Sequence, residues 1–161
     1  MAFVINDIGV IYKQQEQLSE ALKCYLKSYA LQTELGDKVG QATSLNNVGD
    51  IYKAKGDLEK AIEYFAKSLK LQEEINNKHG ISRALSNLGS SYEALKKNKE
   101  ALDYYVKGLA VYEEIKEPEG ASTSYCAVGR MYLAMADQQK ALQYALKGFE
   151  IAKQTEFPIL I

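Results

Sequence analysis

Residues 44–61 read SLNNVGDIYKAKGDLEKA, and a closely related stretch, ALSNLGSSYEALKKNKEA, stands forty residues further on at 84–101. A third version, VINDIGVIYKQQEQLSEA, occupies residues 4–21. A fixed period of this length predicts an array of small supersecondary units that stack on one another. The residues that keep the period show what one repeat is.

Four columns of residues define the repeat. Each copy has a glycine, a tyrosine three residues later and an alanine twelve residues later, and three of the four copies have an aromatic residue at offset sixteen. Apolar residues around these columns recur at helical spacing, so each repeat is predicted to be an antiparallel helical hairpin. The columns are Gly9, Gly49, Gly89 and Gly129; Tyr12, Tyr52, Tyr92 and Tyr132; Ala21, Ala61, Ala101 and Ala141; and Tyr25, Phe65, Tyr105 and the exception, Ala145.

Helix caps and stops stand where the hairpins must turn. Asp57 follows a Lys-Gly pair and is predicted to be the N-cap of a second helix, and Pro118 is predicted in the first turn of a first helix, where a missing N–H does no harm. The other predicted positions are the caps Asn98 and Asp137 and the stop-and-cap pairs Gly36-Asp37 and Asn76-Asn77.

The repeated glycine needs a packing reason, because a glycine inside a helix costs roughly 0.5–1 kcal/mol relative to alanine. We expect Gly49 to face Ala61 of the second helix, with Tyr52 and Phe65 closing the contact on either side. A bulky residue at Gly49 is then expected to force the hairpin apart.

The order G-x2-Y…A-x3-F-x2-[AS] resembles the tetratricopeptide repeat over nearly the whole chain. The forty-residue unit is longer than the common one of about 34 residues and is similar to that of kinesin light chains, cell-polarity scaffolds and bacterial peptide-sensing regulators. The usual tryptophan of the first helix is replaced here by Ile5, Leu45, Leu85 and Tyr125. The resemblance implies an all-α fold, an α-solenoid of stacked antiparallel hairpins wound as a right-handed superhelix.

The period divides the chain into repeats at 1–36, 37–76, 77–116 and 117–156, expected to form a single array. Residues 157–161, FPILI, would begin a truncated fifth helix pair. A terminal repeat normally carries a polar outer face, whereas this segment is apolar. Self-association through the uncapped C-terminal end is therefore an expectation.

Composition argues against several classes of partner. The chain has 161 residues, 47% of them hydrophobic, and a formal charge of -1, so it offers no positive field for nucleic acid or anionic lipid. Its apolar stretches are too short to cross a membrane. Cys24 and Cys126 lie in different repeats without a CxxC pair, and we expect two free thiols, which fits a reducing cytoplasm.

Residues for catalysis are scarce. The single histidine, His79, stands in the predicted turn NNKHG, and the sequence contains no GxxxxGK[ST], no HExxH and no glycine-rich phosphate loop. No enzymatic activity, metal or cofactor is expected from these residues.

Binding is better supported, because the first helices of stacked hairpins line a concave surface that repeat proteins use for partners. Asn47 and Asn87 stand two residues before their glycines, with Asp7 in line, and a primary amide can donate to and accept from a peptide backbone. Relatives with long units hold peptides by such asparagines. Bonds between adjacent repeats and simple solvent exposure are the alternatives. The candidate residues are Asn6, Asp7, Lys13, Asn46, Asn47, Asp50, Lys53, Arg83, Asn87, Ser90 and Arg130.

Two functions remain open from sequence. The first is a peptide- or protein-binding module, which the resemblance places in the sensor or adaptor region of a larger signalling protein. The candidate face has mixed charges, which predict a partner that is neither strongly acidic nor strongly basic. The charged residues are Lys13, Asp50, Lys53, Arg83, Glu93 and Arg130. The second is a structural spacer or oligomerisation scaffold that acts through its ends or its convex side.

Overall fold

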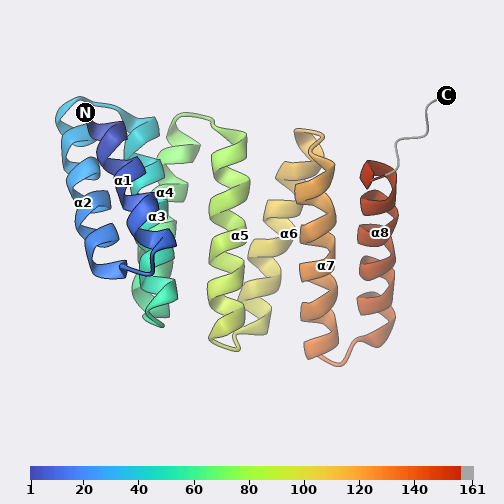
Figure 1. The fold of residues 1–161 in the computed structure, drawn as a ribbon. Helices are drawn as coiled ribbons and strands as arrows, with labels where there is room; N and C mark the ends of the chain where they lie inside the picture. The colour runs from blue at the N-terminus through green and yellow to red at the C-terminus, as the bar shows by residue number, and fades with distance from the viewer. Residues whose placement is uncertain (157–161) are drawn as a thin grey trace. The chain divides into compact units, whose positions relative to one another are not determined.

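The computed structural model describes residues 1–156, so the expected fifth helix pair at 157–161 lies outside the described residues. Within the described part the chain is helical throughout and contains no strand, which confirms the all-α prediction (Figure 1). The helices are α1 (Ala2–Gln14), α2 (Leu18–Glu34), α3 (Lys38–Ala54), α4 (Leu58–Glu74), α5 (Lys78–Ala94), α6 (Asn98–Glu114), α7 (Pro118–Ala134) and α8 (Gln138–Glu156).

The described part of the chain forms two compact units, residues 1–80 and residues 81–156. The first unit holds the hairpins α1–α2 and α3–α4 together with the first turn of α5. The second unit holds the rest of α5, which pairs with α6, and the hairpin α7–α8. The single array of four repeats over 1–161 stays a prediction.

The core of the first unit lies where α3 packs on α2. Ala21 and Tyr25 of α2 meet Val48 and Ile51 of α3, and all four side chains are buried. Burying each large side chain of this kind contributes about 1.5–3 kcal/mol. The contact shows how a first helix covers the preceding hairpin.

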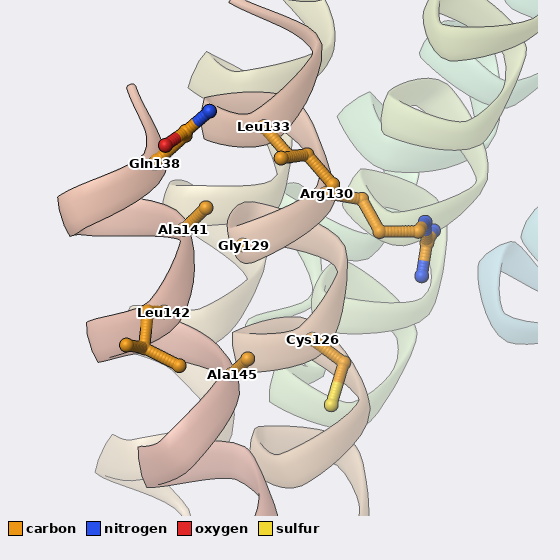
Figure 2. A pocket seen from close by; sticks show the side chains of 8 residues that line it. All are labelled: Cys126, Gly129, Arg130, Leu133, Gln138, Ala141, Leu142 and Ala145. Atoms are coloured by element: carbon orange, nitrogen blue, oxygen red, sulfur yellow. The ribbon is translucent and has the colours of Figure 1, made fainter. Parts of the chain in front are cut away.

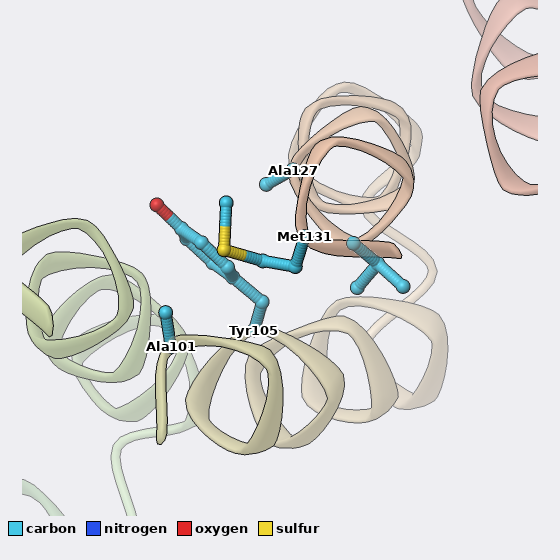
Figure 3. Close-up of a cluster of buried hydrophobic side chains, with 5 residues drawn as sticks. Ala101, Tyr105, Ala127 and Met131 are labelled. Atoms are coloured by element: carbon cyan, nitrogen blue, oxygen red, sulfur yellow. The ribbon is translucent and has the colours of Figure 1, made fainter. Parts of the chain in front are cut away.

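The core of the second unit repeats this contact between α6 and α7. Ala101 and Tyr105 of α6 meet Ala127, Val128 and Met131 of α7. The Tyr105 ring lies beside the Met131 side chain (Figure 3), a favourable pairing of sulfur and aromatic ring.

Every turn between helices contains one residue in the left-handed conformation, and these residues are spaced by twenty positions. The stops predicted at Gly36 and Asn76 are confirmed, with φ of 67° and 52°. Turns within and between hairpins are therefore built alike. The left-handed residues are Glu16, Gly36, Gly56, Asn76, Lys96, Lys116 and Ala136.

The predicted caps are confirmed except one. The Asp57 carboxylate accepts a hydrogen bond from Lys60 N at 3.2 Å, and Pro118 is the first residue of α7. Asn98 is wrong as a cap, because it is the first residue inside α6 and the N-cap is Lys97, which makes no side-chain cap bond. Lys97 lies forty residues after Asp57, so the period places the cap there. The remaining caps, Asp37, Asn77 and Asp137, each accept from the N–H three residues on.

The repeated glycine packs against a ring rather than against the alanine that we expected. A Cβ on Gly49 would lie 2.7 Å from the Phe65 ring, because the ring fills the space between the two helices. Gly9 meets Tyr25, and Gly89 meets Tyr105, at the same distance. The fourth hairpin differs, because a Cβ on Gly129 would meet no ring: its nearest neighbours would be Ala141 O and Ala145 N, at 3.1 and 3.4 Å.

Two smaller expectations can be checked. Cys24 and Cys126 are free thiols, as predicted. Among residues 1–156 no helix is both long and apolar enough to span a bilayer.

Candidate functional site

In the first unit, four of the predicted binding residues contact one another in pairs between the neighbouring helices α1 and α3. Asn47 Nδ2 donates to Asn6 Oδ1 at 3.0 Å, and Lys13 Nζ donates to Asp50 Oδ2 at 3.0 Å. We call this the first-helix face of the first unit, formed by Asn6, Asp7, Lys13, Asn47, Asp50 and Lys53.

Asn46 does not belong to this face. Its side chain is only 3% exposed, because its position on α3 differs from that of Asn47 by about 100° around the helix. The expectation that both neighbouring asparagines are presented to a partner is corrected to Asn47 alone. Asp7, by contrast, is exposed.

The Asn6–Asn47 pair keeps hydrogen-bonding capacity. A primary amide carries an acceptor oxygen and a donor nitrogen, and the pair uses one of each. In the described part of the chain, Asn6 Nδ2 and Asn47 Oδ1 have no further partner. The pair therefore offers one donor and one acceptor, whichever amide donates in the bond between them.

In the second unit, α5 carries Arg83, Asn87 and Ser90, and α7 carries Arg130. These four residues form the first-helix face of the second unit. Ser90 Oγ donates to the Asn87 carbonyl of its own helix at 3.0 Å. Arg130 instead reaches across to α5, where its Nε and Nη2 both donate to the Glu93 carboxylate at 3.2 Å. Arg83 is exposed.

Glu93, one of the charged residues that the sequence placed on the candidate face, organises this face of the second unit. Its carboxylate also accepts a hydrogen bond from the Tyr105 hydroxyl at 2.6 Å. Burial and then this hydrogen bond raise the pKa of Tyr105, and the bond to Glu93 raises the pKa of Arg130. The tyrosine therefore stays neutral and the arginine charged.

The two ion pairs occupy the same positions relative to the repeated glycine. Lys13 and Glu93 stand four residues after their glycines, and Asp50 and Arg130 stand one residue after theirs. The charges are reversed between the units. This pairing was visible in the sequence once the forty-residue register was aligned, and our sequence analysis missed it.

An open apolar pocket of about 470 Å³ lies between α7 and α8 (Figure 2). Its rim carries Leu133 and Leu142, which are 60% and 62% exposed. The Arg130 side chain extends away from α8, which leaves the pocket apolar (Figure 2). The lining residues are Cys126, Gly129, Arg130, Leu133, Gln138, Ala141, Leu142 and Ala145.

The pocket opens where the aromatic column is broken. Ala145 stands at offset sixteen, the position that Tyr25, Phe65 and Tyr105 fill with a ring in the other hairpins. The sequence showed the break at Ala145. It did not show the pocket, because the volume depends on what else packs there.

Groups for metal binding are absent from the described residues, where no cluster of three or more His, Cys, Asp or Glu side chains is found. His79 is corrected from a turn residue to the second residue of α5, where it is exposed.

Comparison with solved structures supports the fold. The chain is 20% identical to BtubC (BKLC) from P. vanneervenii, with a TM-score of 0.89 over 96% of this chain and 64% of that one. It is 27% identical to a signal transduction ATPase with numerous domains and a tetratricopeptide repeat sensor from Pyrococcus horikoshii (TM-score 0.86, 96% and 24% covered). It is 15% identical to a Rap protein complexed with Competence and Sporulation Factor (TM-score 0.78, 97% and 44% covered).

The chain thus spans less than two thirds of the length of each of these proteins. A search of curated proteins finds no match. The family model described as Tetratricopeptide repeat matches residues 1–74 and 80–154. With the fold of stacked helical hairpins, this match confirms the resemblance seen in the sequence. The chain belongs to the tetratricopeptide repeat family, and its fold is that of a protein-interaction module.

Proposed function

We propose that the chain is a recognition module that holds an extended peptide or protein segment against its first-helix faces. The Asn6–Asn47 pair is the observation that carries the proposal. It offers one donor and one acceptor at a half-buried surface position, which complements the C=O and N–H of a peptide unit. Such recognition reads the backbone and tolerates different side chains.

Geometry and charge are consistent with this occupant. First helices packed about 10 Å apart meet an extended chain, which rises about 3.3 Å per residue, at every third residue. The Lys13–Asp50 and Glu93–Arg130 pairs each combine one positive and one negative group. A partner with little net charge fits such faces better than a strongly acidic or basic one.

A sensor or adaptor role in a larger signalling protein follows by analogy. In the Pyrococcus horikoshii ATPase the tetratricopeptide repeats are a sensor, and the Rap protein was crystallised with Competence and Sporulation Factor. We extend this role to the present chain, whose partner would be a peptide or a protein segment.

The test is selection of peptides from a random displayed library on the immobilised chain, followed by affinity measurements on the selected peptides. Replacing Asn6 and Asn47 together by alanine removes two hydrogen bonds to the ligand, each worth about 0.5–1.5 kcal/mol, so we expect binding about five- to a hundredfold weaker. Gln143→Ala, an exposed amide on α8, is the matched control. Unchanged affinity in the double variant would show that the amide pair does not hold the peptide.

The second candidate, a spacer or oligomerisation scaffold, is favoured by a different observation. Large apolar side chains are exposed on α1 and α8, among them Phe3 and Phe149. Under this function the library yields no peptide that depends on Asn6 and Asn47, and association occurs through the end helices.

A further inference from the structure

The exposed apolar residues of α1 lie on a face that the other first helices bury. Ile8 and Ile11, 41% and 53% exposed, stand one residue before and two after Gly9. The same positions in α3 are Val48 and Ile51, which are fully buried against α2. In α7 they are Val128 and Met131, buried against α6. Within the described residues, no hairpin lies against this face of α1.

The other half of this contact is displayed by α8. Ala141, Leu142 and Ala145 stand at the positions of Ala101, Leu102 and Tyr105, with which α6 receives α7. Leu142 is exposed, Ala145 opens the pocket, and Leu146 and Phe149 extend the apolar surface. Among residues 1–156, which the structure describes, no first helix lies on this face of α8.

The α1 face and the α8 face are both apolar at a position where neighbouring first helices within each unit form an ion pair. Within each unit, the residue four after one glycine pairs with the residue one after the next, as in Lys13–Asp50 and Glu93–Arg130. The corresponding residues for a first helix lying on α8 are Leu133 and Val10. Both are apolar and exposed, so the charge is lost on both sides together.

A buried polar contact between α2 and α3 also has apolar counterparts on both α1 and α8. Between α2 and α3, Ser44 Oγ lies 2.7 Å from the Gln32 amide and 3.2 Å from Ser28 Oγ. At the matching positions α1 carries Val4, and α8 carries Ala152 and Gly148.

The polar groups are therefore replaced by apolar ones on both faces. The side chain on α1 is larger than its internal counterpart, and those on α8 are smaller. Ala145, in place of a ring, adds further room on α8. The faces are complementary in polarity and in size.

We propose that α1 of one molecule stacks on α8 of a second copy of this chain, in the way that α3 stacks on α2. The contact joins two different faces, so it leaves one of each unoccupied at the ends of every assembly. Association consequently continues past the dimer unless an end is blocked. It does not use the Asn6–Asn47 pair.

Sedimentation velocity of the chain over a wide concentration range tests the proposal. We expect the average mass to rise above the 18.0 kDa of one chain without a plateau at the dimer. Ile11→Glu blocks the α1 face and Leu142→Glu blocks the α8 face, and each buries a charge in the contact. Each variant alone should associate at least about tenfold more weakly than the unmodified chain. It is therefore expected to stay at 18.0 kDa at concentrations where the unmodified chain associates.

Mixing the two variants gives the sharpest outcome. Each retains one intact face, so an equimolar mixture should form a dimer of twice 18.0 kDa and stop there. That result also proves that both variants are folded. Leu35→Glu changes an exposed leucine at the end of α2, on neither α1 nor α8. It should associate like the unmodified chain, as should Asn6→Ala with Asn47→Ala.

Three results would overturn the proposal. The unmodified chain stays monomeric at every concentration, and the end faces then belong to a different partner. Either variant alone still associates. Or the mixture of the two variants remains monomeric while both show the helical circular dichroism of the unmodified chain.

Discussion

The first and second units build the same pair of hairpins with different side chains at matching positions. In the first unit both hairpins place a ring beside the repeated glycine, Tyr25 and Phe65. In the second unit one hairpin does so, with Tyr105, and the other has Ala145 and an open pocket. The backbone register sets where helices meet, and the residue at offset sixteen decides whether the space is filled.

The turns differ between the units as well. The first unit uses glycine at two of its left-handed positions, Gly36 and Gly56, whereas the second has Lys96, Lys116 and Ala136. A residue with a Cβ is strained there by about 1–2 kcal/mol. Substituting glycine at these turn positions of the second unit should therefore raise its free energy of unfolding.

Removing the ring from the second unit should have the largest effect. Tyr105→Ala is expected to lower the free energy of unfolding by about 3–5 kcal/mol, since it leaves a cavity under α7, where Tyr105 is only 5% exposed. Denaturant unfolding followed by circular dichroism measures this. Ala145→Tyr is the reciprocal change and should stabilise, by at most about 1.5 kcal/mol, because its ring would stay partly exposed. Equal losses in both variants would contradict the comparison.

Adding one methyl group beside a ring should cost less. Gly49→Ala places a Cβ 2.7 Å from Phe65 and is expected to destabilise by about 1–3 kcal/mol through overpacking. Gly108→Ala is the control in the second unit, because its nearest neighbour, Leu85 Cβ, lies at 3.5 Å. It should stabilise by about 0.5–1 kcal/mol through helix propensity. Thermal unfolding that moves both variants in the same direction would refute this.

Substitutions in the turns and caps of the second unit should each change the free energy of unfolding by about 1 kcal/mol. Ala136→Gly relieves the positive φ of 64°, and Lys97→Asp supplies the cap that Asp57 provides in the first unit. Both should raise the midpoint of denaturant unfolding. Gly56→Ala, the opposite change, should lower it. A neutral Ala136→Gly would mean that its turn relaxes without strain.

Charge reversal should have the smallest effect. Lys13→Glu faces Asp50 with a like charge and is expected to destabilise by up to about 1 kcal/mol, since the pair is partly exposed. Adding Asp50→Arg reproduces the charge order of Glu93–Arg130 and should restore the loss. High salt should shrink the difference between the single and double variants. A double variant no more stable than the single one would show that the two positions do not couple.

The sequence predicted the helices well because their period is regular. Asp57, Asp37 and Pro118 marked helix starts correctly, since caps act locally. The cap predicted at Asn98 was wrong by one residue. Asparagine is a preferred N-cap residue, and the true N-cap, Lys97, has a side chain that makes no cap bond, so the sequence pointed to Asn98.

The candidate site was harder to predict. Asn47 was placed on the first-helix face, but its neighbour Asn46 is buried, because burial depends on the rotation of α3 against what packs on it. Glu93 was placed on the candidate face from the sequence, but its bonds to Arg130 and Tyr105 were not predicted, since these residues lie on two other helices. Such a triad exists only after folding.

The turns spaced by twenty residues have a consequence for how such a chain can change over generations. Each turn presents the same backbone conformation whether it lies within a hairpin or between hairpins. Unequal recombination between two turns forty residues apart therefore rejoins ends of the same geometry and adds or removes whole hairpins. Natural selection can then vary the length of the chain without redesigning a junction.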